Sequence, residues 1–350
     1  MTEEQKTKWV KIDLAETDWQ CQAEAALQEA AQLLQQGELV AFPTETVYGL
    51  GGNALLEHSA KKIYAAKGRP SDNPLIVHIA KAEKAEELAE VSPLAKQLMA
   101  AFFPGPLTLV LPKKPCIPYA VTGGLDTVAI RNPQHPVTLA LLERCQLPIA
   151  APSANLSGKP SPTTGAHVYH DLAGRIAMVL DSGSAGVGLE STVLDVTADP
   201  PVILRPGAIT QADLLPYCGQ VLLGGAKVAN GEAPKAPGMK YKHYAPRGQV
   251  VLSTGEALQQ EYAKLHSAQS DKKLVVLATQ STLEQQRLRA ATHYILAATP
   301  ADLVGFAQQL FAALRWCDEQ QADVILVEAV EDTELGCAIM NRLRKAAGKK

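Results

Sequence analysis

The chain has 350 residues, of which 47% are hydrophobic and 20% are charged, and its formal net charge is −3. This length is too great for one ordinary hydrophobic core and predicts two domains, while the nearly neutral charge balance excludes a global field for nucleic acid, so that any RNA contact needs a local basic patch. No run of about eighteen or more apolar residues is present, which argues against a membrane span, and the N-terminus has no apolar signal core.

The N-terminal half of the chain mixes strands with a few helices. Its first twenty residues are polar and show little pattern, so we interpret them as an extension. Helices are predicted over 22–36, 58–67 and 136–145, and strands over 38–43, 75–79, 107–111, 127–131, 147–151, 176–180, 191–196 and 201–205. Many strands with few long helices favour a twisted, open α/β sheet wrapped by helices rather than a barrel. The glycine-rich run 49–52 does not match G-x-G-x-x-G and is interpreted as a tight turn.

Residues 216–247 interrupt this order, because they are rich in Gly, Pro and Lys and hold too few apolar residues for a core. We interpret them as a linker. Strands are then predicted over 249–253, 273–278, 293–297 and 323–328, alternating with helices over 255–266, 280–290, 301–318 and 334–346. This alternation is typical of a small, parallel, doubly wound domain. Thr299, Pro300 and Asp302 predict the start of the third of these helices as its N-cap, N1 and N3 residues.

The six cysteines are far apart and include no C-x-x-C pair. In a chain of this length, that spacing indicates reduced, mostly buried thiols in the cytosol rather than a disulfide framework or a zinc site. They are Cys21, Cys116, Cys145, Cys218, Cys317 and Cys337.

The segment 67–78 combines two cations, an amide and an imidazole with a β-branched apolar run. Arg69 offers a planar fork of donors, Lys67 a point charge, and Asn73 both donors and acceptors, a mixture suited to a polyanion. The two cations alone could equally serve to offset a helix dipole. Asn73 and the prolines on either side of it favour a shaped anion site.

Other polar groups follow predicted strands. The hydroxyl-rich loop 152–164 begins where a buried strand ends, which is where ligands bind in α/β sheets, although it could also be a solvated turn. Arg131 ends an apolar strand and needs an anion, which could be a protein carboxylate or a ligand carboxylate. Thr46 could line a small pocket or serve as a helix cap. His78 could be a ligand or a hydrogen-bonded structural residue.

No Ser-His-Asp order, H-E-x-x-H motif or phosphate-binding P-loop is present. Cations, hydroxyls and amides dominate the candidate positions. This composition favours chemistry that holds charged substrates together over chemistry that uses a protein nucleophile.

Taken together, these motifs resemble the Sua5/YrdC/YwlC family of threonylcarbamoyl-AMP synthases. The resemblance covers residues 25–215 and rests on P-T-E-T-V-Y-G-L, K-G-R-P-S-D-N-P-L-I-V-H, F-F-P-G-P-L-T, V-A-I-R, A-P-S-A-N-x-S-G, E-S-T-V and R-P-G-A. The run P-G-M-K-Y-K-H-Y-A-P and the domain after it look like the longer Sua5 form. Each motif is weak alone, but the set is specific.

The resemblance implies a fold, an activity and partners. The fold would be a YrdC-like twisted open sheet with a basic cleft, followed by a small Rossmann-like Sua5 domain. The activity would be that of a nucleotidyltransferase that joins L-threonine, bicarbonate and ATP into threonylcarbamoyl-AMP and pyrophosphate, with Mg²⁺ accompanying ATP. A separate transferase complex would receive the product for t6A modification of tRNA, and a weak direct contact with tRNA is a further expectation.

The family's functional residues transfer to matching positions. The threonine site would comprise Thr46, His78, Arg131, the backbone at Ala151, and Ser191. The ATP site would comprise Arg69, Asn73, Thr127, Ser153, Ser161, Arg205 and Tyr244, with Tyr244 closing over the nucleotide. Lys67 and Arg69 would act in catalysis, and no protein side chain is predicted to bind metal.

We therefore expect four segments: an N-terminal extension over 1–20, a YrdC-like catalytic domain over 21–215, a linker or lid over 216–247 and a Sua5 domain over 248–350. Alternatives remain. An RNA-binding module would use the basic cleft without chemistry. A carbamoyl-transfer enzyme of hydrogenase maturation carries a similar domain, but also zinc-type cysteine pairs that this sequence lacks. A ribosome-maturation factor is a third alternative, which no specific motif in the sequence supports.

Overall fold

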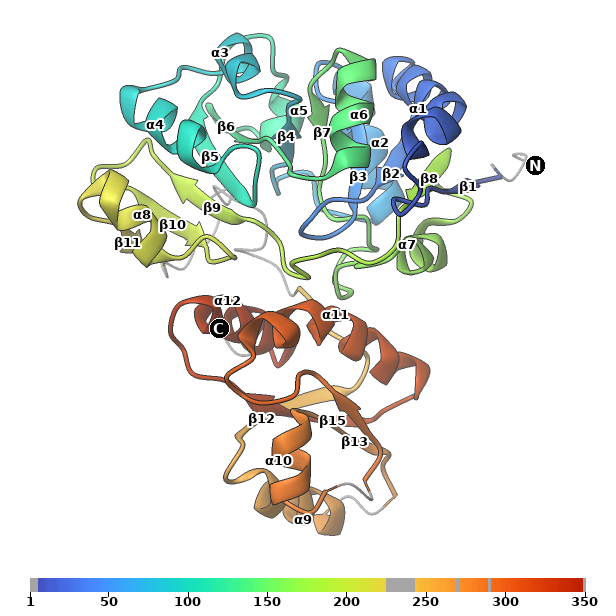
Figure 1. Cartoon of the computed structure of the whole chain (residues 1–350), viewed down its shortest axis with the longest axis vertical. Helices are drawn as coiled ribbons and strands as arrows, with labels where there is room; N and C mark the ends of the chain where they lie inside the picture. Colours follow the sequence, from blue (N-terminus) through green and yellow to red (C-terminus); the bar gives the residue numbers. More distant parts are fainter. Residues whose placement is uncertain (1–5, 225–242, 269–270, 289–290, 349–350) are drawn as a thin grey trace. The chain divides into compact units, whose positions relative to one another are not determined.

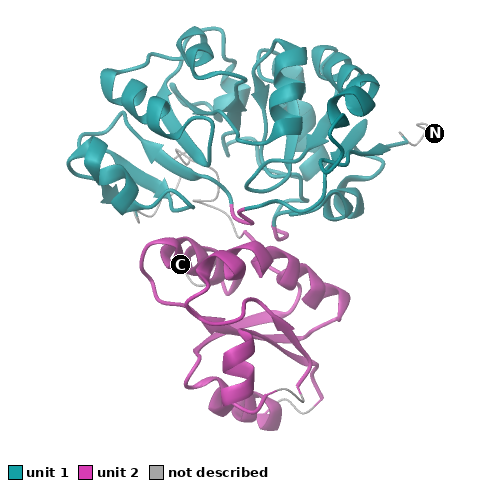
Figure 2. Ribbon diagram, in the orientation of Figure 1, with its two compact units in different colours: residues 1–157, 161–186, 190–240 teal, residues 158–160, 187–189, 241–350 magenta. Residues whose placement is uncertain are grey.

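The structure is a computed structural model that describes residues 6–224, 243–268, 271–288 and 291–348. Two compact units make up the chain (Figure 2). The first comprises residues 1–157, 161–186 and 190–240, and the second comprises 241–350 together with the short segments 158–160 and 187–189. Much of the predicted linker, residues 225–242, lies outside the described residues.

The first unit is built on an eleven-stranded mixed sheet with the strand order β1-β8-β2-β3-β7-β4-β6-β5-β9-β10-β11 (Figure 1). Its strands are β1 (Lys8–Lys11), β2 (Val40–Phe42), β3 (Gly49–Asn53), β4 (Ile76–His78), β5 (Leu107–Pro112), β6 (Thr127–Arg131), β7 (Ile149–Ala150), β8 (Met178–Asp181), β9 (Thr192–Asp195), β10 (Val202–Arg205) and β11 (Leu222–Leu223). Its helices are α1 (Trp19–Gln35), α2 (Glu57–Lys67), η1 (Ala82–Lys84), α3 (Ala85–Leu88), α4 (Pro93–Phe102), α5 (Tyr119–Thr122), α6 (Pro136–Cys145), α7 (Gly165–Leu172) and α8 (Gln211–Cys218).

Three expectations for this unit are wrong. The linker does not begin at residue 216, because α8 runs to Cys218 and β11 pairs in parallel with β10. Residues 8–11 are not part of an extension, because β1 pairs in parallel with β8. Residues 49–52 are not a turn but most of β3, which lies between β2 and β7. Glycine suits this strand because a Cβ at Gly51 would come within 2.6 Å of the Phe42 ring and 2.9 Å of Ile149. Local sequence gives no sign of that close packing.

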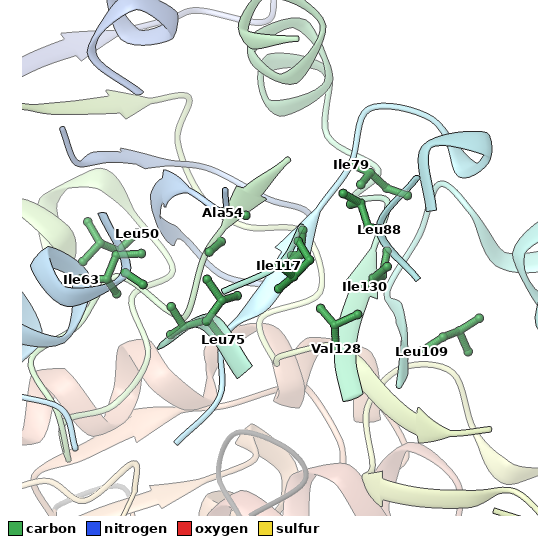
Figure 3. Close-up of a cluster of buried hydrophobic side chains, with 14 of the residues drawn as sticks. Leu50, Ala54, Ile63, Leu75, Ile79, Leu88, Leu109, Ile117, Val128 and Ile130 are labelled. Atoms are coloured by element: carbon green, nitrogen blue, oxygen red, sulfur yellow. The ribbon is translucent and has the colours of Figure 1, made fainter. Parts of the chain in front are cut away.

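Side-chain alternation divides the sheet into two faces. Val128 and Ile130 point into the main hydrophobic core, which also contains Leu75 and Ile63 (Figure 3). Val77 belongs to the same core. Their neighbours along the same strands point to the opposite face.

That opposite face has two parts. Under β2, β7 and β8 it carries the core that packs against α1 and α6, including Leu27, Phe42 and Leu141. Under β4, β6, β5 and β9 it carries only a small apolar cluster, formed by Ile76, Val110, Ala129 and Val193. We call this second part the site face, because His78, Thr108, Thr127, Arg131 and Ser191 share the alternation of the cluster along their strands.

The second unit has a four-stranded, wholly parallel sheet in the order β12-β15-β13-β14, as predicted for a doubly wound domain. Helices α11 and α12 lie on one side of the sheet and α9 and α10 on the other (Figure 1). Its elements are β12 (Gln249–Thr254), α9 (Leu258–Ala268), β13 (Leu274–Ala278), α10 (Gln280–Gln285), β14 (His293–Ile295), α11 (Leu303–Glu319), β15 (Val324–Ala329) and α12 (Leu335–Ala346). Asp302 is the N-cap of α11 and accepts from Gly305 N, so Thr299 is not the cap.

Across the described ranges of both units, every helix is too short or too polar to cross a membrane.

Candidate active site

Arg131 ends β6 and lies on the site face, two residues after Ala129. Its side chain is buried, and the sequence left open whether a protein or a ligand supplies its anion. The structure shows a protein carboxylate, since Arg131 Nη2 lies 2.6 Å from Glu45 Oε1. Arg131 also donates to Thr46 Oγ1 at 2.9 Å and to the Gly105 carbonyl at 3.3 Å. Thr46 and Arg131, both expected in the threonine site, are therefore in direct contact.

His78 lies beside Arg131, because the parallel pairing of β4 and β6 puts the two residues in register. Burial, reinforced by the nearby Arg131 charge, lowers the pKa of His78 to about 3, so the imidazole is neutral at neutral pH. Its Nδ1 is 3.1 Å from the Ile76 carbonyl. That carbonyl also accepts the Ala151 N–H at 2.8 Å, so a backbone contact between Ala151 and a substrate would use the Ala151 carbonyl.

Ser191 and Arg205 join the threonine set to the ATP set. Arg205 Nε donates to the Ser191 carbonyl at 3.1 Å, and Nη2 donates to the Ser191 hydroxyl at 3.2 Å. The same hydroxyl is 2.7 Å from Thr108 Oγ1 on the neighbouring strand β5. All three side chains are buried. A residue predicted to bind threonine and one predicted to bind ATP thus form one hydrogen-bonded cluster.

Ser161 extends this cluster through the residue before Ser191. Its hydroxyl donates to Glu190 Oε1, and both side chains are buried. The loop that carries Ser161 is therefore tied to the start of β9. Ser161 is therefore hydrogen-bonded to the residue that directly precedes Ser191, a member of the expected threonine site.

Lys67 is the last residue of α2 and is only 2% exposed. Its ammonium donates to the carbonyls of Ser153 and Asn155 and, at 3.3 Å, to the Asn155 side-chain oxygen. Ser153 Oγ in turn donates to that side-chain oxygen at 2.5 Å. Lys67 thus fixes the loop in which Ser153, an expected ATP ligand, is placed. This is a positioning role beside the catalytic role expected from the sequence.

Arg69 folds back onto the segment that leads into β4. Its guanidinium donates to the carbonyls of Asn73, at 3.3 and 3.4 Å, and Pro74, at 3.1 Å. Asn73 is 1% exposed, and among the described residues its side-chain Oδ1 has no hydrogen-bond partner. Asn73 therefore offers a buried acceptor at a position where an ATP ligand is expected. Thr127, another expected ATP ligand, begins β6 on the site face, four residues before Arg131.

Tyr244 belongs to the second unit. Its ring stacks on Phe311 of α11 with the ring centroids 5.2 Å apart, and the Arg342 guanidinium carbon lies 5.8 Å from the ring centroid. The residue is 4% exposed and adopts a φ of 62°, in the left-handed region. Its expected contact with ATP stays a prediction.

Sequence reasoning missed the acidic partners of the site. Glu45 and Glu190 stand in the motifs P-T-E-T-V-Y-G-L and E-S-T-V, where neither is assigned a role. The available signal was the demand of a buried arginine for an anion, which left the partner's identity open. Within the described ranges, no group of three or more His, Cys, Asp or Glu side chains is placed to hold a metal ion.

Comparisons with known proteins identify the relatives of this chain. Residues 32–207 match the family model Sua5_yciO_yrdC, described as telomere recombination, and residues 209–348 match a model described as threonylcarbamoyl-AMP synthase, C-terminal domain. A threonylcarbamoyl-AMP synthase of Bacillus subtilis is 48% identical over 98% of each chain. One from Pyrococcus abyssi is 47% identical over 91% of this chain and 93% of its own.

A solved structure extends the likeness to the fold. The crystal structure of P. abyssi Sua5 complexed with L-threonine superposes with a TM-score of 0.89 at 44% identity, covering 98% of both chains. Coverage of this extent includes both units of the fold described above. The chain belongs to the Sua5/YciO/YrdC family, in the long form that carries the additional C-terminal domain.

Proposed function

We propose that this protein is an L-threonylcarbamoyladenylate synthase, a nucleotidyltransferase that condenses L-threonine, bicarbonate and ATP and releases pyrophosphate. The observation that carries the proposal is the bond between Arg205 and Ser191, which joins the residues expected at the two substrates into one buried cluster. Relatives at 48% and 47% identity that bear this name support it, as does the threonine complex of the P. abyssi protein.

The threonine part of the site would work by charge pairing. Arg131 would bind the substrate carboxylate, with its fork of donors matched to two oxygens. Thr46 already accepts from this guanidinium and would hold it in place. His78 is neutral, so it can act as a hydrogen-bond partner without adding a second positive charge next to Arg131.

The reaction would join two bound substrates without a protein nucleophile. The threonine ammonium would first lose a proton, and the neutral amine would attack carbon dioxide, with loss of a second proton, or bicarbonate, with loss of water, to give an N-carboxylate. A carboxylate oxygen would then form a bond to the α-phosphorus of ATP as the bond from that phosphorus to pyrophosphate breaks. Arg69 and Lys67 would stabilise the charge on the departing pyrophosphate, and the protein's main contribution would be alignment and electrostatics.

Magnesium is proposed as the companion of ATP. Mg²⁺ usually keeps several waters and binds through one or two carboxylates plus substrate phosphates, so here the ATP phosphates would hold it, and the unpartnered Asn73 Oδ1 could accept a hydrogen bond from one of its waters. Bound there, it would neutralise phosphate charge. The residues present fit such an ion without a dedicated cluster of carboxylates.

The product would pass to a t6A transferase complex that modifies tRNA, and we place the protein in the cytoplasm. The free cysteines, including the buried Cys145 and Cys317, fit a reducing compartment. Burial raises the pKa of both thiols to about 12, so they stay protonated and unreactive.

The test is a single incubation of the purified protein with MgATP, bicarbonate and labelled threonine. Pyrophosphate should form only when threonine and bicarbonate are both present, and the label should move to an adenylate. Pyrophosphate release that does not depend on threonine would refute the proposal, as would the absence of any release under conditions where the protein binds ATP.

A further inference from the structure

The ion pair between Glu45 and Arg131 has an incomplete half. The two side chains are 12% and 5% exposed, and the pair uses Glu45 Oε1. Both carboxylate oxygens are buried and have no hydrogen-bond partner among the described residues, and the ion-pair distance is given by Oε1. A buried acceptor without a donor is destabilising, more so when it is charged. Such atoms in folded proteins therefore generally accept a hydrogen bond from a ligand or from water.

The groups around Glu45 do not supply the missing donor as a cation. His135 is close enough for the Glu45 charge to act on it, but burial outweighs that charge and lowers the pKa of His135 to about 4. The imidazole is therefore neutral at neutral pH, and its Nε2 lies 3.2 Å from Ser182 Oγ. Arg131 is thus the cation seen against Glu45 in the described part of the chain, and it leaves Oε2 unused.

An amino acid bound at Arg131 brings a positive charge with it. Its ammonium group is attached to the carbon next to the carboxylate, so it must lie within a few ångströms of the carboxylate that the guanidinium binds. Two like charges at so short a separation repel strongly inside a protein, where the effective dielectric constant is well below that of water. A site that holds a zwitterion through Arg131 therefore needs an anion on the side of the ammonium.

We propose that Glu45 is that anion: it binds the α-ammonium of the substrate and makes the site specific for amino acids. The proposal rests on the proposed function, because it assumes that Arg131 receives the substrate carboxylate. Binding would exchange one internal ion pair for two pairs with the zwitterion. The net charge of the site would not change, and Oε2 would gain its donor.

The alternative is that Glu45 only neutralises Arg131 and holds it in place. The two roles differ in their response to the substrate's ammonium. A group that binds the ammonium favours threonine over the analogue with hydroxyl in its place, 2,3-dihydroxybutanoate of matching stereochemistry. A group that only positions Arg131 affects both ligands equally, because both present the same carboxylate.

The experiment measures equilibrium binding of both ligands, without ATP, to the unchanged protein and to Glu45→Gln. A charge-assisted hydrogen bond is worth about 1.5–3 kcal/mol, which corresponds to about a 10–150-fold weaker binding of threonine to the variant, while affinity for the hydroxy acid should change less than about threefold. Glu38→Gln is the matched control, because Glu38 forms a partly exposed pair with Lys62. It should change neither affinity.

Three results would overturn the proposal: an equal loss for both ligands, unchanged threonine affinity, or tighter threonine binding, which would mean that Glu45 competes with the substrate for Arg131. Should Glu45→Gln fail to fold, Glu45→Asp retains the charge but withdraws it by one methylene. The same selective loss for threonine is then expected, and an equal loss again overturns the proposal.

The two proposals fail in different ways. If the unchanged protein forms pyrophosphate with threonine but Glu45→Gln loses both ligands equally, the synthase stands and the role of Glu45 falls. If the unchanged protein neither binds threonine nor forms pyrophosphate with it, both fall together.

Discussion

Arg205 encloses Ser191 from two directions, with Nε on the Ser191 carbonyl at 3.1 Å and Nη2 on the Ser191 hydroxyl at 3.2 Å. Arg205 is 5% exposed, so these bonds form away from solvent. Because Ser191 is expected to bind threonine and Arg205 to bind ATP, these bonds would couple the two expected substrate sites through one side chain.

Replacing Arg205 with lysine should therefore weaken the binding of both substrates. Lysine keeps the charge but not the planar fork, so it cannot make both bonds to Ser191. Losing one charge-assisted hydrogen bond predicts about a 10–100-fold fall in kcat/KM for threonine and for ATP. Ser161→Ala is the contrasting variant, since Ser161 bonds to Glu190 and should affect ATP alone. Steady-state kinetics with each substrate varied in turn decide; an Arg205→Lys enzyme impaired only in ATP binding would contradict the coupling.

Gly207 is a site where a single methyl group should disturb the threonine site. A Cβ there would lie 2.8 Å from both the Glu190 carbonyl oxygen and the Ser191 carbonyl carbon, and it would also clash with the Thr192 amide nitrogen. Backbone atoms cannot rotate away as a side chain can, so Gly207→Ala should shift this segment. We expect about a tenfold or greater loss of threonine affinity, measured by calorimetry.

Gly186→Ala is the matched control for this substitution. A Cβ at Gly186 meets only the Glu45 carbonyl oxygen, at 3.9 Å, which is an ordinary contact. It should leave threonine affinity within about twofold. Equal behaviour of the two alanine variants would show that the approach of residue 207 to Ser191 does not matter for binding.

Lys67 should matter more than its place at a helix end suggests. It is almost fully buried and donates to the carbonyls of Ser153 and Asn155. Lys67→Met keeps the length of the side chain but leaves these acceptors without their cation. By analogy with other preorganised charges, pyrophosphate release should fall by about 10²-fold or more. Lys61→Met on the same helix removes only an exposed pair with Glu57 and should change little. A Lys67→Met protein with normal turnover would remove Lys67 from the site.

The buried histidines predict how stability depends on pH. Burial lowers the pKa of His78 to about 3 and that of His135 to about 4, both below the ordinary value of 6.5. As pH falls below about 6.5 the unfolded chain therefore binds protons that the folded protein does not. The contribution of the two histidines to the free energy of unfolding is fully present above this pH. It should fall as pH drops toward 4, by up to about 1.4 kcal/mol per pH unit for each histidine.

Urea denaturation between pH 7.5 and 5 measures this slope. His135→Gln should reduce it, because one of the two protons is removed from the unfolded state. His58→Gln, at an exposed position of α2, is the control and should leave the slope as it is. A slope that is the same in all three proteins would mean that His135 is not buried as a neutral group.

Sequence alone anticipated the elements whose signal is local. The predicted strands 107–111 and 127–131 correspond to β5 and β6, because continuous apolar runs mark buried strands. The predicted alternation of strands and helices in the C-terminal domain is also confirmed, because each of those elements carries its own local pattern of apolar residues. The capping prediction was off by three residues, since Asp302 rather than Thr299 caps α11.

The missed features depend on partners distant in sequence. Nothing in Lys8–Lys11 indicates a strand, and the segment becomes one by pairing with β8, far along the chain. The carboxylate of Glu45 meets Arg131 only because the turn after β2 comes close to the end of β6. The family resemblance supplied the expected site residues, whereas the contacts of Glu45 and Glu190 are visible only in the structure.

The packing of Tyr244 on Phe311 allows a test of the second unit. Phe311 is fully buried on α11, and Phe→Ala at such a site destabilises by about 3–5 kcal/mol. Phe311→Ala would also remove the ring on which Tyr244 stacks. Tyr244 depends on such support, because its backbone adopts a left-handed conformation that is unfavourable for a tyrosine. If Tyr244 contributes to ATP binding as the family resemblance implies, Phe311→Ala should weaken ATP affinity and leave threonine affinity unchanged.

Phe306→Ala separates this local effect from general destabilisation. Phe306 is equally buried on the same helix, so its loss leaves a similar cavity and should lower the free energy of unfolding by a similar amount. No ring contact with Tyr244 is found for Phe306 in the described residues, so ATP affinity should hold in this variant under conditions where it is folded. The measurement is ATP binding by calorimetry next to thermal unfolding of both variants. If both lose ATP affinity to the same extent, stability of the unit explains the effect, and Tyr244 then has no special part in holding the nucleotide.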